Sequence, residues 1–403
     1  MFGPVDNDYV QLCTVNGEVL GFTDSAAVSS FSPEDLSTSP VDFDDSLIPR
    51  LAYGSSVAHV VKDYASGGVI GLAQVSPYTG GAPYASVYRQ SKSETSGKQE
   101  RVEIARVPMQ TAPYSHSFGF SGSHAVVCEH QWTLDSGSLF KGEKFMEASR
   151  LGSNYTRLHL VEIETGEVTV FDAPEPFFGI HFANVREAVL DDGSLVVEFV
   201  MPTWTSPEGG GGSGGAKEVC NPYAVFDFFR VEDEALRDSF NEVCGNKLKK
   251  HTLFKTGPRA GEAAVQTLDS GWFEYPHFNW HMRGEATCFT YLTQFYADGT
   301  GVFGSMAIVK FDQCKGERVA TFSEGSTFVS EPHFIARDPS HPYTAGEDDG
   351  VIITTIMDGA SEGKLSTLLI LDAADLSVIA RLPLERSVPA TVHGWFVTKE
   401  EEI

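Results

Sequence analysis

Short strands joined by tight polar turns recur along this chain and constrain its fold more than any other feature. Residues 159–171 read HLVEIETGEVTVF, residues 307–322 and 367–382 repeat the strand–turn–strand pattern, and residues 18–38 carry a fainter copy. Runs rich in β-branched and aromatic residues, bounded by Gly, Asp and Ser, predict antiparallel hairpins. Repeated hairpins with irregular spacing are typical of propeller blades or of a large barrel. The sequence therefore predicts an all-β fold.

Composition narrows the class of protein. The chain has 403 residues with 41% hydrophobic content, which suits one large all-β domain or two to three smaller ones and excludes a disordered chain. Its 55 acidic and 29 basic residues give a net charge of −26, which repels phosphate backbones, so no nucleic-acid partner is expected. No secretory signal or apolar spanning segment is evident. The six scattered cysteines form no CxxC pair and are expected to be reduced and intracellular.

Two segments depart from the strand pattern. Residues 206–219 are rich in glycine and serine and are expected to form a flexible surface insertion. Residues 231–241, VEDEALRDSFN, are the best helix candidate.

Four histidines stand in short apolar settings that favour strands or turns. They are His59 in SSVAHVVKDY, His116 in PYSHSFGFSG, His181 in FFGIHFANVRE and His393 in VPATVHGWFV. Imidazole suits Zn, Cu, Fe and Ni, so four such residues from separate strands would make a histidine-only metal centre. Taken singly, each is more often a satisfied core or turn residue. Sequence spacing does not decide between these readings.

A histidine that binds a metal usually has its second ring nitrogen held by a carboxylate or a carbonyl. A metal centre therefore predicts acidic residues in apolar, strand-like surroundings. Three fit: Glu274 in GWFEYPHFNW, Glu331 in FVSEPHFIARDP and Asp24 in VLGFTDSAAVSSF. Burial of such a carboxylate is costly unless it is paired, and a histidine N–H is a suitable partner. Taken singly, each acid is more often exposed.

Read together and in order, these segments resemble the carotenoid cleavage oxygenases, the family that includes β-carotene oxygenases and the retinal-pigment-epithelium isomerase. The resemblance covers nearly the whole chain. Its blocks are TDSAAVSSFSPEDLST, AHVVKD, YSHSFGFSGSHAVV, IHFANVRE, FEYPHFNW, VSEPHFIARDP with EDDGVIITTIMDG, and VPATVHGWFV.

The resemblance implies a fold and a site. The fold would be a single domain over residues 1–403, a seven-bladed β-propeller with a loop and helix dome over an iron on its axis. The implied Fe2+ ligands are His59, His116, His181 and His393. Three acids are implied to orient three of them: Asp24 for His116, Glu274 for His181 and Glu331 for His393. Substrate-tunnel candidates are Thr23, Phe118, Phe178 and Trp395, although plain core packing also suits the aromatic ones.

The implied activity is oxidative cleavage of a conjugated C=C bond in a carotenoid or apocarotenoid by dioxygen, giving aldehydes or ketones. Central cleavage is the first expectation. The alternatives are a retinoid isomerohydrolase that uses iron as a Lewis acid, a stilbene-type oxygenase, and an inactive propeller. A cytoplasmic or plastid location with peripheral membrane contact accompanies the resemblance.

The chain departs from the family in three ways, of which one is mild: Ser121 stands where Thr is usual. Asp24 stands where the family usually has Glu, and the shorter side chain reaches less far. The chain also has only 23 residues before the Asp24 motif, fewer than family members usually have. The resemblance therefore implies an incomplete N-terminus that lacks the first strands.

Overall fold

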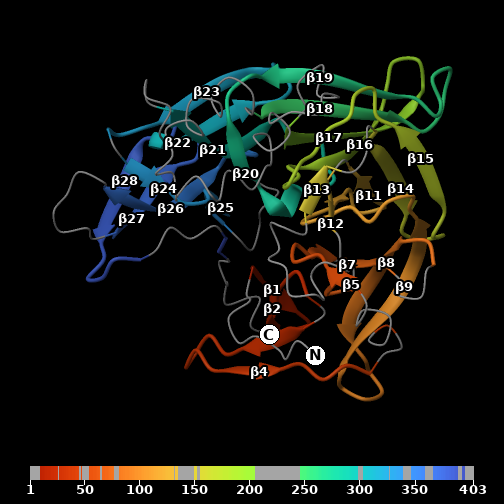
Figure 1. Ribbon diagram of the computed structural model, residues 1–403. Coiled ribbons are helices and arrows are strands. Elements are labelled where there is room, and N and C mark those ends of the chain that lie inside the picture. Colours follow the sequence, from red (N-terminus) through yellow and green to blue (C-terminus); the bar gives the residue numbers. More distant parts are fainter. Residues whose placement is uncertain are drawn as a thin grey trace. The chain divides into compact units, whose positions relative to one another are not determined.

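The computed structural model describes residues 10–25, 27–44, 47, 54–63, 66–76, 81–130, 132–134, 149–151, 155–204, 246–297, 303–325, 327–338, 346–358, 366–388 and 393–394. The chain divides into two compact units, one of residues 1–172 with 393–403 and one of residues 173–392. Regular structure in both is almost wholly antiparallel β-sheet (Figure 1). This confirms the all-β prediction.

The first unit holds three sheets of four or five strands and one two-stranded sheet. The first sheet is β1 (Gln11–Val15), β2 (Glu18–Phe22), β3 (Val28–Phe31) and β4 (Thr38–Pro40). The second is β5 (Gly54–Ser56), β6 (Val61–Asp63), β7 (Gly68–Val75), β8 (Tyr84–Lys92) and β9 (Gln99–Pro108). The third is β10 (Gly119–Phe120), β11 (His124–Glu129), β14 (Arg157–Glu162) and β15 (Val168–Asp172), and β12 (Trp132–Leu134) pairs separately with β13 (Ser149–Leu151).

The second unit repeats this arrangement in three sheets. The first is β16 (Val185–Val189), β17 (Leu195–Thr203), β18 (Lys247–Phe254) and β19 (Ala263–Asp269). The second is β20 (Phe273–His277), β21 (Phe289–Ala297), β22 (Phe303–Asp312) and β23 (Glu317–Phe322). The third is β24 (Thr327–Val329), β25 (His333–Ala336), β26 (Gly350–Asp358), β27 (Ser366–Asp372) and β28 (Val378–Pro383).

Local sequence explains the hairpins. Asn16 and Gly17 alone separate β1 from β2, and both have positive φ, 47° and 81°. A two-residue turn of this kind matches the twist of the flanking strands, and Asn-Gly adopts it readily. Gly166 has φ 72° in the turn between β14 and β15, where the sequence predicted a turn.

Burial falls from the middle strands of a sheet to its last strand. Every described side chain of β7 is buried, whereas β28 is largely exposed. Apolar side chains of successive sheets pack together: Leu72 of β7 and Val127 of β11 belong to one core cluster in the first unit. In the second unit, Ile308 of β22 and Ile352 of β26 share another. Stability therefore comes from face-to-face packing of neighbouring sheets.

Several expectations need correction. The described residues hold six sheets of four or five strands, so the expected seven blades are wrong. The number seven came with the family resemblance, and between β11 and β14 the described residues form only the two-stranded sheet β12–β13. The expected helices of a dome are also not found in the described ranges, where the one helical element is a 3-10 turn, η2 (Trp280–Met282). The physical reason is that the polar and β-branched runs in the described ranges favour strands and turns over helices.

Other expectations concern segments and cysteines. Residues 206–219, residues 231–241 and Trp395 lie outside the described residues. The expectation of reduced cysteines is wrong for one pair, because Cys288 and Cys314 form a disulfide. Nothing in their spacing, 26 residues apart, signals the pairing. Within the described part of the chain, no helix has the length and hydropathy needed to span a bilayer.

Candidate metal centre

Several predicted site residues lie where the first strand of a sheet is interrupted. Both β5 and β6 pair with β7, and the break between them holds His59. Both β24 and β25 pair with β26, and that break holds Glu331. In β20 the register shifts between Glu274 and His277. A residue outside the hydrogen-bonded ladder of a sheet does not have to follow the up-and-down alternation of strand side chains. Its side chain can therefore turn toward a shared centre.

Three of the four predicted ligands meet in the first unit. The Nε2 atoms of His59 and His116 are 3.0 Å apart. The ring of His393 lies 4.4 Å from that of His59 and 6.1 Å from that of His116. The candidate ligand nitrogens of these three residues lie within 4.8 Å of one another.

This donor set fits a transition metal. Metal–imidazole bonds of about 2.1 Å place two neighbouring nitrogens of an octahedron roughly 3.0 Å apart. The His59–His116 nitrogen separation of 3.0 Å matches that edge. Imidazole donors suit iron among other first-row metals. The three rings can therefore face one ion without rearrangement of the segments that carry them.

His116 is held on its far side by an acid and a phenol. Its Nδ1 lies 3.2 Å from Oδ2 of Asp24 and 3.1 Å from the hydroxyl of Tyr114. An acid at Nδ1 keeps the proton there and directs the Nε2 lone pair toward His59. The next residue back is also fixed, because Ser115 exchanges two hydrogen bonds with the side chain of Gln74. The shorter Asp24 thus does reach His116.

Asp24 is stabilised as an anion by several donors. It accepts hydrogen bonds from the Tyr114 hydroxyl at 2.7 Å and from the backbone N–H of Ala58 at 3.2 Å. Burial by itself raises the pKa of Asp24, but His116, Tyr114 and Ala58 outweigh it and hold the pKa below its usual value. Sequence reasoning missed Tyr114, although its place two residues before His116 was a usable signal.

In the second unit, His181 pairs with Glu274. His181 lies a few residues before β16, the first strand of its sheet. Its Nδ1 lies 2.7 Å from Oε2 of Glu274. Both side chains are nearly buried, with 11% and 5% of their surfaces exposed. When Glu274 is ionised, Nδ1–H of His181 donates to it, and this leaves the Nε2 lone pair of His181 open to a metal.

Glu274 occupies a dry environment. Its Oε2 also accepts the backbone N–H of Tyr275 at 3.1 Å, whereas its Oε1 is buried with no hydrogen-bond partner. Burial raises the pKa of Glu274 to about 8, and the Tyr275 amide opposes the shift. Tyr275 has φ 55°, a left-handed conformation that is uncommon for an aromatic residue. That kink brings its amide back onto the carboxylate.

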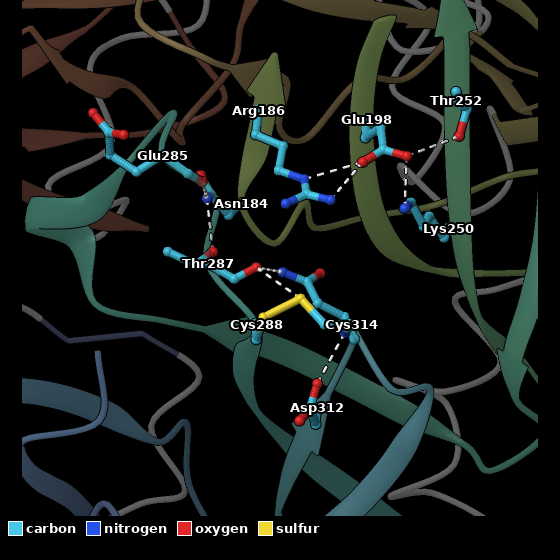
Figure 2. A network of polar contacts seen from close by, with 11 residues as sticks. Asn184, Arg186, Glu198, Lys250, Thr252, Glu285, Thr287, Cys288, Asp312 and Cys314 are labelled. Carbon is cyan, nitrogen blue, oxygen red and sulfur yellow. Dashed lines mark hydrogen bonds and ion pairs between the residues drawn. A yellow bond between two sulfur atoms is a disulfide. The ribbon is translucent and has the colours of Figure 1, made fainter. Parts of the chain in front are cut away.

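The loop that carries His181 is fastened by Asn184 (Figure 2). The Asn184 amide donates to the carbonyl of Glu285 at 2.9 Å and to Oγ1 of Thr287 at 2.8 Å, and it accepts from the N–H of Gly284 at 3.0 Å. These bonds join the segment before β16 to the segment before β21. The ligand candidate therefore sits on a fixed backbone.

The remaining predicted residues are placed as follows. The Glu331 carboxylate lies 3.0 Å from Nε2 of His333, and Glu331 belongs to the second unit whereas His393 belongs to the first. Phe118 is 3% exposed within the core shared by the second and third sheets. Phe178 is 2% exposed, and its ring lies 5.5 Å from that of Trp204. Thr23 is half-buried.

Comparison with protein families gives one match over almost the whole chain. The family described as "Retinal pigment epithelial membrane protein" matches residues 3–398. A probable carotenoid cleavage dioxygenase 4 of Arabidopsis thaliana is 40% identical over 101 residues, which are 23% of this chain and 16% of the plant protein. The Crocus sativus zeaxanthin 7,8(7',8')-cleavage dioxygenase is 24% identical over 380 residues, covering 90% of this chain and 89% of its own length. The mouse beta,beta-carotene 15,15'-dioxygenase is 23% identical, covering 77% and 55%.

Solved structures show the same fold. A cobalt-substituted apocarotenoid oxygenase of Synechocystis superposes with TM-score 0.72 and 20% identity, covering 96% of this chain and 74% of that one. The lignostilbene dioxygenase of Pseudomonas brassicacearum gives TM-score 0.69 and 18% identity, covering 95% and 73%. With these likenesses, the six described blade-type sheets identify the architecture as a β-propeller.

Proposed function

Because the chain belongs to the Retinal pigment epithelial membrane protein family, we propose that it is an Fe(II)-dependent dioxygenase that cleaves a conjugated C=C bond of a carotenoid or apocarotenoid. The products are aldehydes or ketones. The observation that carries the proposal is the cluster of His59, His116 and His393, whose nitrogens are spaced for one metal ion. The relatives whose names state carotenoid cleavage support the choice of reaction.

His181 is proposed as the fourth ligand. Its Nδ1 is directed to Glu274, so its Nε2 carries the free lone pair. The family blocks in the sequence place it third among the four histidines. The order of those blocks and the matched orientation of His116 and His181 by acids support a common role.

Iron held by the four neutral imidazoles would supply the dioxygen chemistry. The residues of this chain supply binding, orientation and dryness. Asp24 and Glu274 fix the rings of His116 and His181 in the tautomer that exposes Nε2. Four neutral ligands would leave the charge of the ion uncompensated, and the carboxylates of Asp24 and Glu274 would supply part of the compensation. Glu331 is proposed to act likewise on His393.

The substrate is proposed to be a long apolar polyene, with central cleavage as the preferred position. The mouse relative is named for 15,15' cleavage and the Crocus relative for 7,8 cleavage, so the cleaved bond is the finer part of the proposal. Thr23, Phe118, Phe178 and Trp395 remain the candidate tunnel residues. A plastid location is proposed because two plant relatives are named as chloroplastic and chromoplastic, and peripheral membrane contact would bring the enzyme to its lipid-dissolved substrate.

One alternative substrate has specific support. The lignostilbene dioxygenase shares the fold across 95% of this chain, so a stilbene is the second candidate. Either substrate would offer a conjugated double bond to the iron, and the two differ in that a stilbene carries phenol groups that need polar partners.

The experiment is dioxygen uptake by the full chain after anaerobic reconstitution with Fe(II). β-Carotene, an apocarotenal and a hydroxystilbene are supplied in parallel, and products are separated by chromatography. The proposal expects uptake with a carotenoid or apocarotenoid and aldehyde products. Uptake with the stilbene alone moves the function to the second candidate. An iron-loaded chain that consumes no dioxygen with any of the three contradicts the proposal.

A further inference from the structure

We propose that Cys288, Cys314 and Asp312 form a second metal site, which binds a thiophilic divalent cation such as Zn2+ when the disulfide is reduced. All three residues lie at one end of the sheet β20–β23: Cys288 directly precedes β21, Asp312 ends β22, and Cys314 lies in the turn to β23. One ligand atom from each lies within 4.8 Å of the other two. None of them belongs to the histidine centre.

The backbone geometry suits two thiolates on one ion (Figure 2). The Cα atoms of Cys288 and Cys314 are 5.2 Å apart. Zinc–sulfur bonds are about 2.3 Å, so two thiolates on one ion are separated by at most roughly 4.6 Å. Side-chain rotation alone covers the change from a bonded pair of sulfurs to such a separation. Reduction therefore opens the site without movement of the sheet.

Asp312 supplies a third ligand that is already oriented. The residue is 3% exposed. Its Oδ1 accepts the backbone N–H groups of Cys314 at 3.0 Å and Lys315 at 2.9 Å. Its Oδ2 lies 3.3 Å from Nζ of Lys315, whose side chain is 68% exposed. An ion pair with so exposed a lysine is weak, so a divalent cation displaces it at Oδ2.

The chain around the sulfurs is fixed by bonds that do not involve sulfur. The backbone N–H groups of Cys288 and Phe289 donate to the Glu347 carboxylate, at 2.8 Å and 2.5 Å. The N–H of Gln313 donates to the Cys288 carbonyl at 2.8 Å, and its side-chain amide donates to the Thr287 carbonyl at 2.7 Å. Both cysteines therefore keep their places when the sulfur–sulfur bond is cut.

The reduction step is accessible and balanced. Cys314 is exposed and Cys288 is half-buried, so the thiolate of a dithiol reductant attacks Sγ of Cys314. The sulfur–sulfur bond breaks, and its electron pair goes to Sγ of Cys288, which takes a proton. The second thiol of the reductant then attacks the mixed disulfide, releases Cys314, and leaves the reductant oxidised to a disulfide. Binding of the cation displaces the protons of the two thiols.

Cobalt titration of the full chain tests the site. The chain is treated with a phosphine reductant, which adds no thiol, and Co2+ is added while sulfur-to-cobalt charge-transfer absorption is followed. The histidine centre has no sulfur ligand and gives no such band. In the reduced chain we expect the band to appear and to saturate at about one equivalent of Co2+. We expect no band in the unreduced chain and none in reduced Cys314→Ser. A reduced wild-type chain without the band overturns the proposal.

Two variants complete the test. Asp312→Asn keeps an oxygen acceptor for the Cys314 and Lys315 amides but removes the anionic ligand, so cobalt affinity should fall at least about tenfold. Cys128→Ala removes a buried free thiol in the other unit and should keep the band. Unchanged affinity in Asp312→Asn, or loss of the band in Cys128→Ala, contradicts the proposed ligand set. His116→Ala should also keep the band, which separates this result from failure of the iron centre.

Discussion

The two units hold the acids that face their candidate histidine ligands in different ways. In the first, Asp24 accepts from Tyr114 and Ala58 as well as facing His116, and its pKa is lowered. In the second, Glu274 faces His181 in a drier setting, with one oxygen unpartnered and a raised pKa. An acid with several hydrogen-bond donors orients a ligand at little cost, whereas a dry acid with few donors costs free energy that a bound cation can return. Each unit should therefore respond differently when its acid is removed.

Removal of a ligand ring should have the largest effect. His116→Ala takes away one nitrogen of the closely spaced pair with His59. Iron affinity and turnover should fall by more than the roughly 100-fold typical of a lost orienting partner. His124→Gln, another buried histidine of the first unit, is the control and should keep its iron. Anaerobic iron titration measures both, and tight iron binding by His116→Ala would remove this residue from the centre.

Neutralising the two orienting acids should weaken iron binding to different extents in the two units. Glu274→Gln should weaken iron binding about 100-fold, and Asp24→Asn only about tenfold. The reason is that the Tyr114 hydroxyl remains within 3.1 Å of the His116 ring nitrogen after Asp24 is neutralised. Iron affinities of the two variants, measured side by side, decide the matter. A larger loss in Asp24→Asn would reverse the comparison.

Glu129, a second buried acid of the first unit, tests whether a carboxylate with several hydrogen-bond donors stabilises the fold. Oε1 of Glu129 accepts from the N–H groups of Gln110 and Thr111, and Oε2 lies 3.2 Å from Nε2 of His159. Burial raises the pKa of Glu129, but His159 and these amides outweigh it and lower the pKa. Glu129→Gln should cost about 2–3 kcal/mol of unfolding free energy at neutral pH.

The pH dependence of that loss follows from the sign of the shift. Because the folded pKa of Glu129 lies below the unfolded value, its stabilisation is present above the unfolded pKa and disappears as pH falls through the folded pKa. Urea unfolding at several pH values should therefore show wild type and Glu129→Gln converging in acid. Glu164→Gln, at an exposed position, should match wild type throughout. A constant gap between wild type and Glu129→Gln would argue that charge is not involved.

The smallest expected effect concerns His251 in the second unit. The ring is 1% exposed, stacks on Phe199 at 4.8 Å, and has neither nitrogen hydrogen-bonded. Replacement by leucine removes two unpaired polar atoms from the core, so His251→Leu should stabilise the fold by about 1–2 kcal/mol. A destabilised variant would mean that the ring nitrogens are satisfied in solution.

Lower pH should enlarge the stability difference between wild type and His251→Leu. Burial, and secondarily the charge of Lys249, lowers the pKa of His251 to about 3. The unfolded chain then binds a proton that the folded chain does not, so stability is lost as pH falls below about 6.5. At pH 5 this costs wild type roughly 2 kcal/mol that His251→Leu does not lose. Thermal unfolding at pH 8 and pH 5 measures both parts.

Both the hairpins and the site residues could be predicted from the sequence, but from different kinds of signal. Alternating apolar runs with turns such as Asn16–Gly17 predict strands directly, because turn chemistry is local. The pairing of His181 with Glu274, 93 residues away, is not local, and only the resemblance to a family joined them. Tyr114, Tyr275 and the His333 partner of Glu331 were not foreseen: each lies within two residues of a predicted site residue, but no periodic pattern marks which neighbour makes the contact.

The number of sheets and the disulfide lay beyond the sequence for a related reason. A hairpin count does not say which strands share a sheet, and the short β12–β13 pair cannot be told from a longer one by composition. Cys288 and Cys314 come together only because β21 and β22 pair along their length. Tertiary register, set by packing, decides both.

The most direct test of the account is the iron content of His181→Ala beside that of wild type after anaerobic Fe(II) reconstitution. His181 is the proposed fourth ligand, and its pairing with Glu274 leaves Nε2 for the metal. We predict about one iron per wild-type chain and a weakly bound or absent iron in His181→Ala, with the fold intact by circular dichroism. Wild-type chain that binds no iron, or His181→Ala that retains iron as tightly as wild type, would contradict a four-histidine centre.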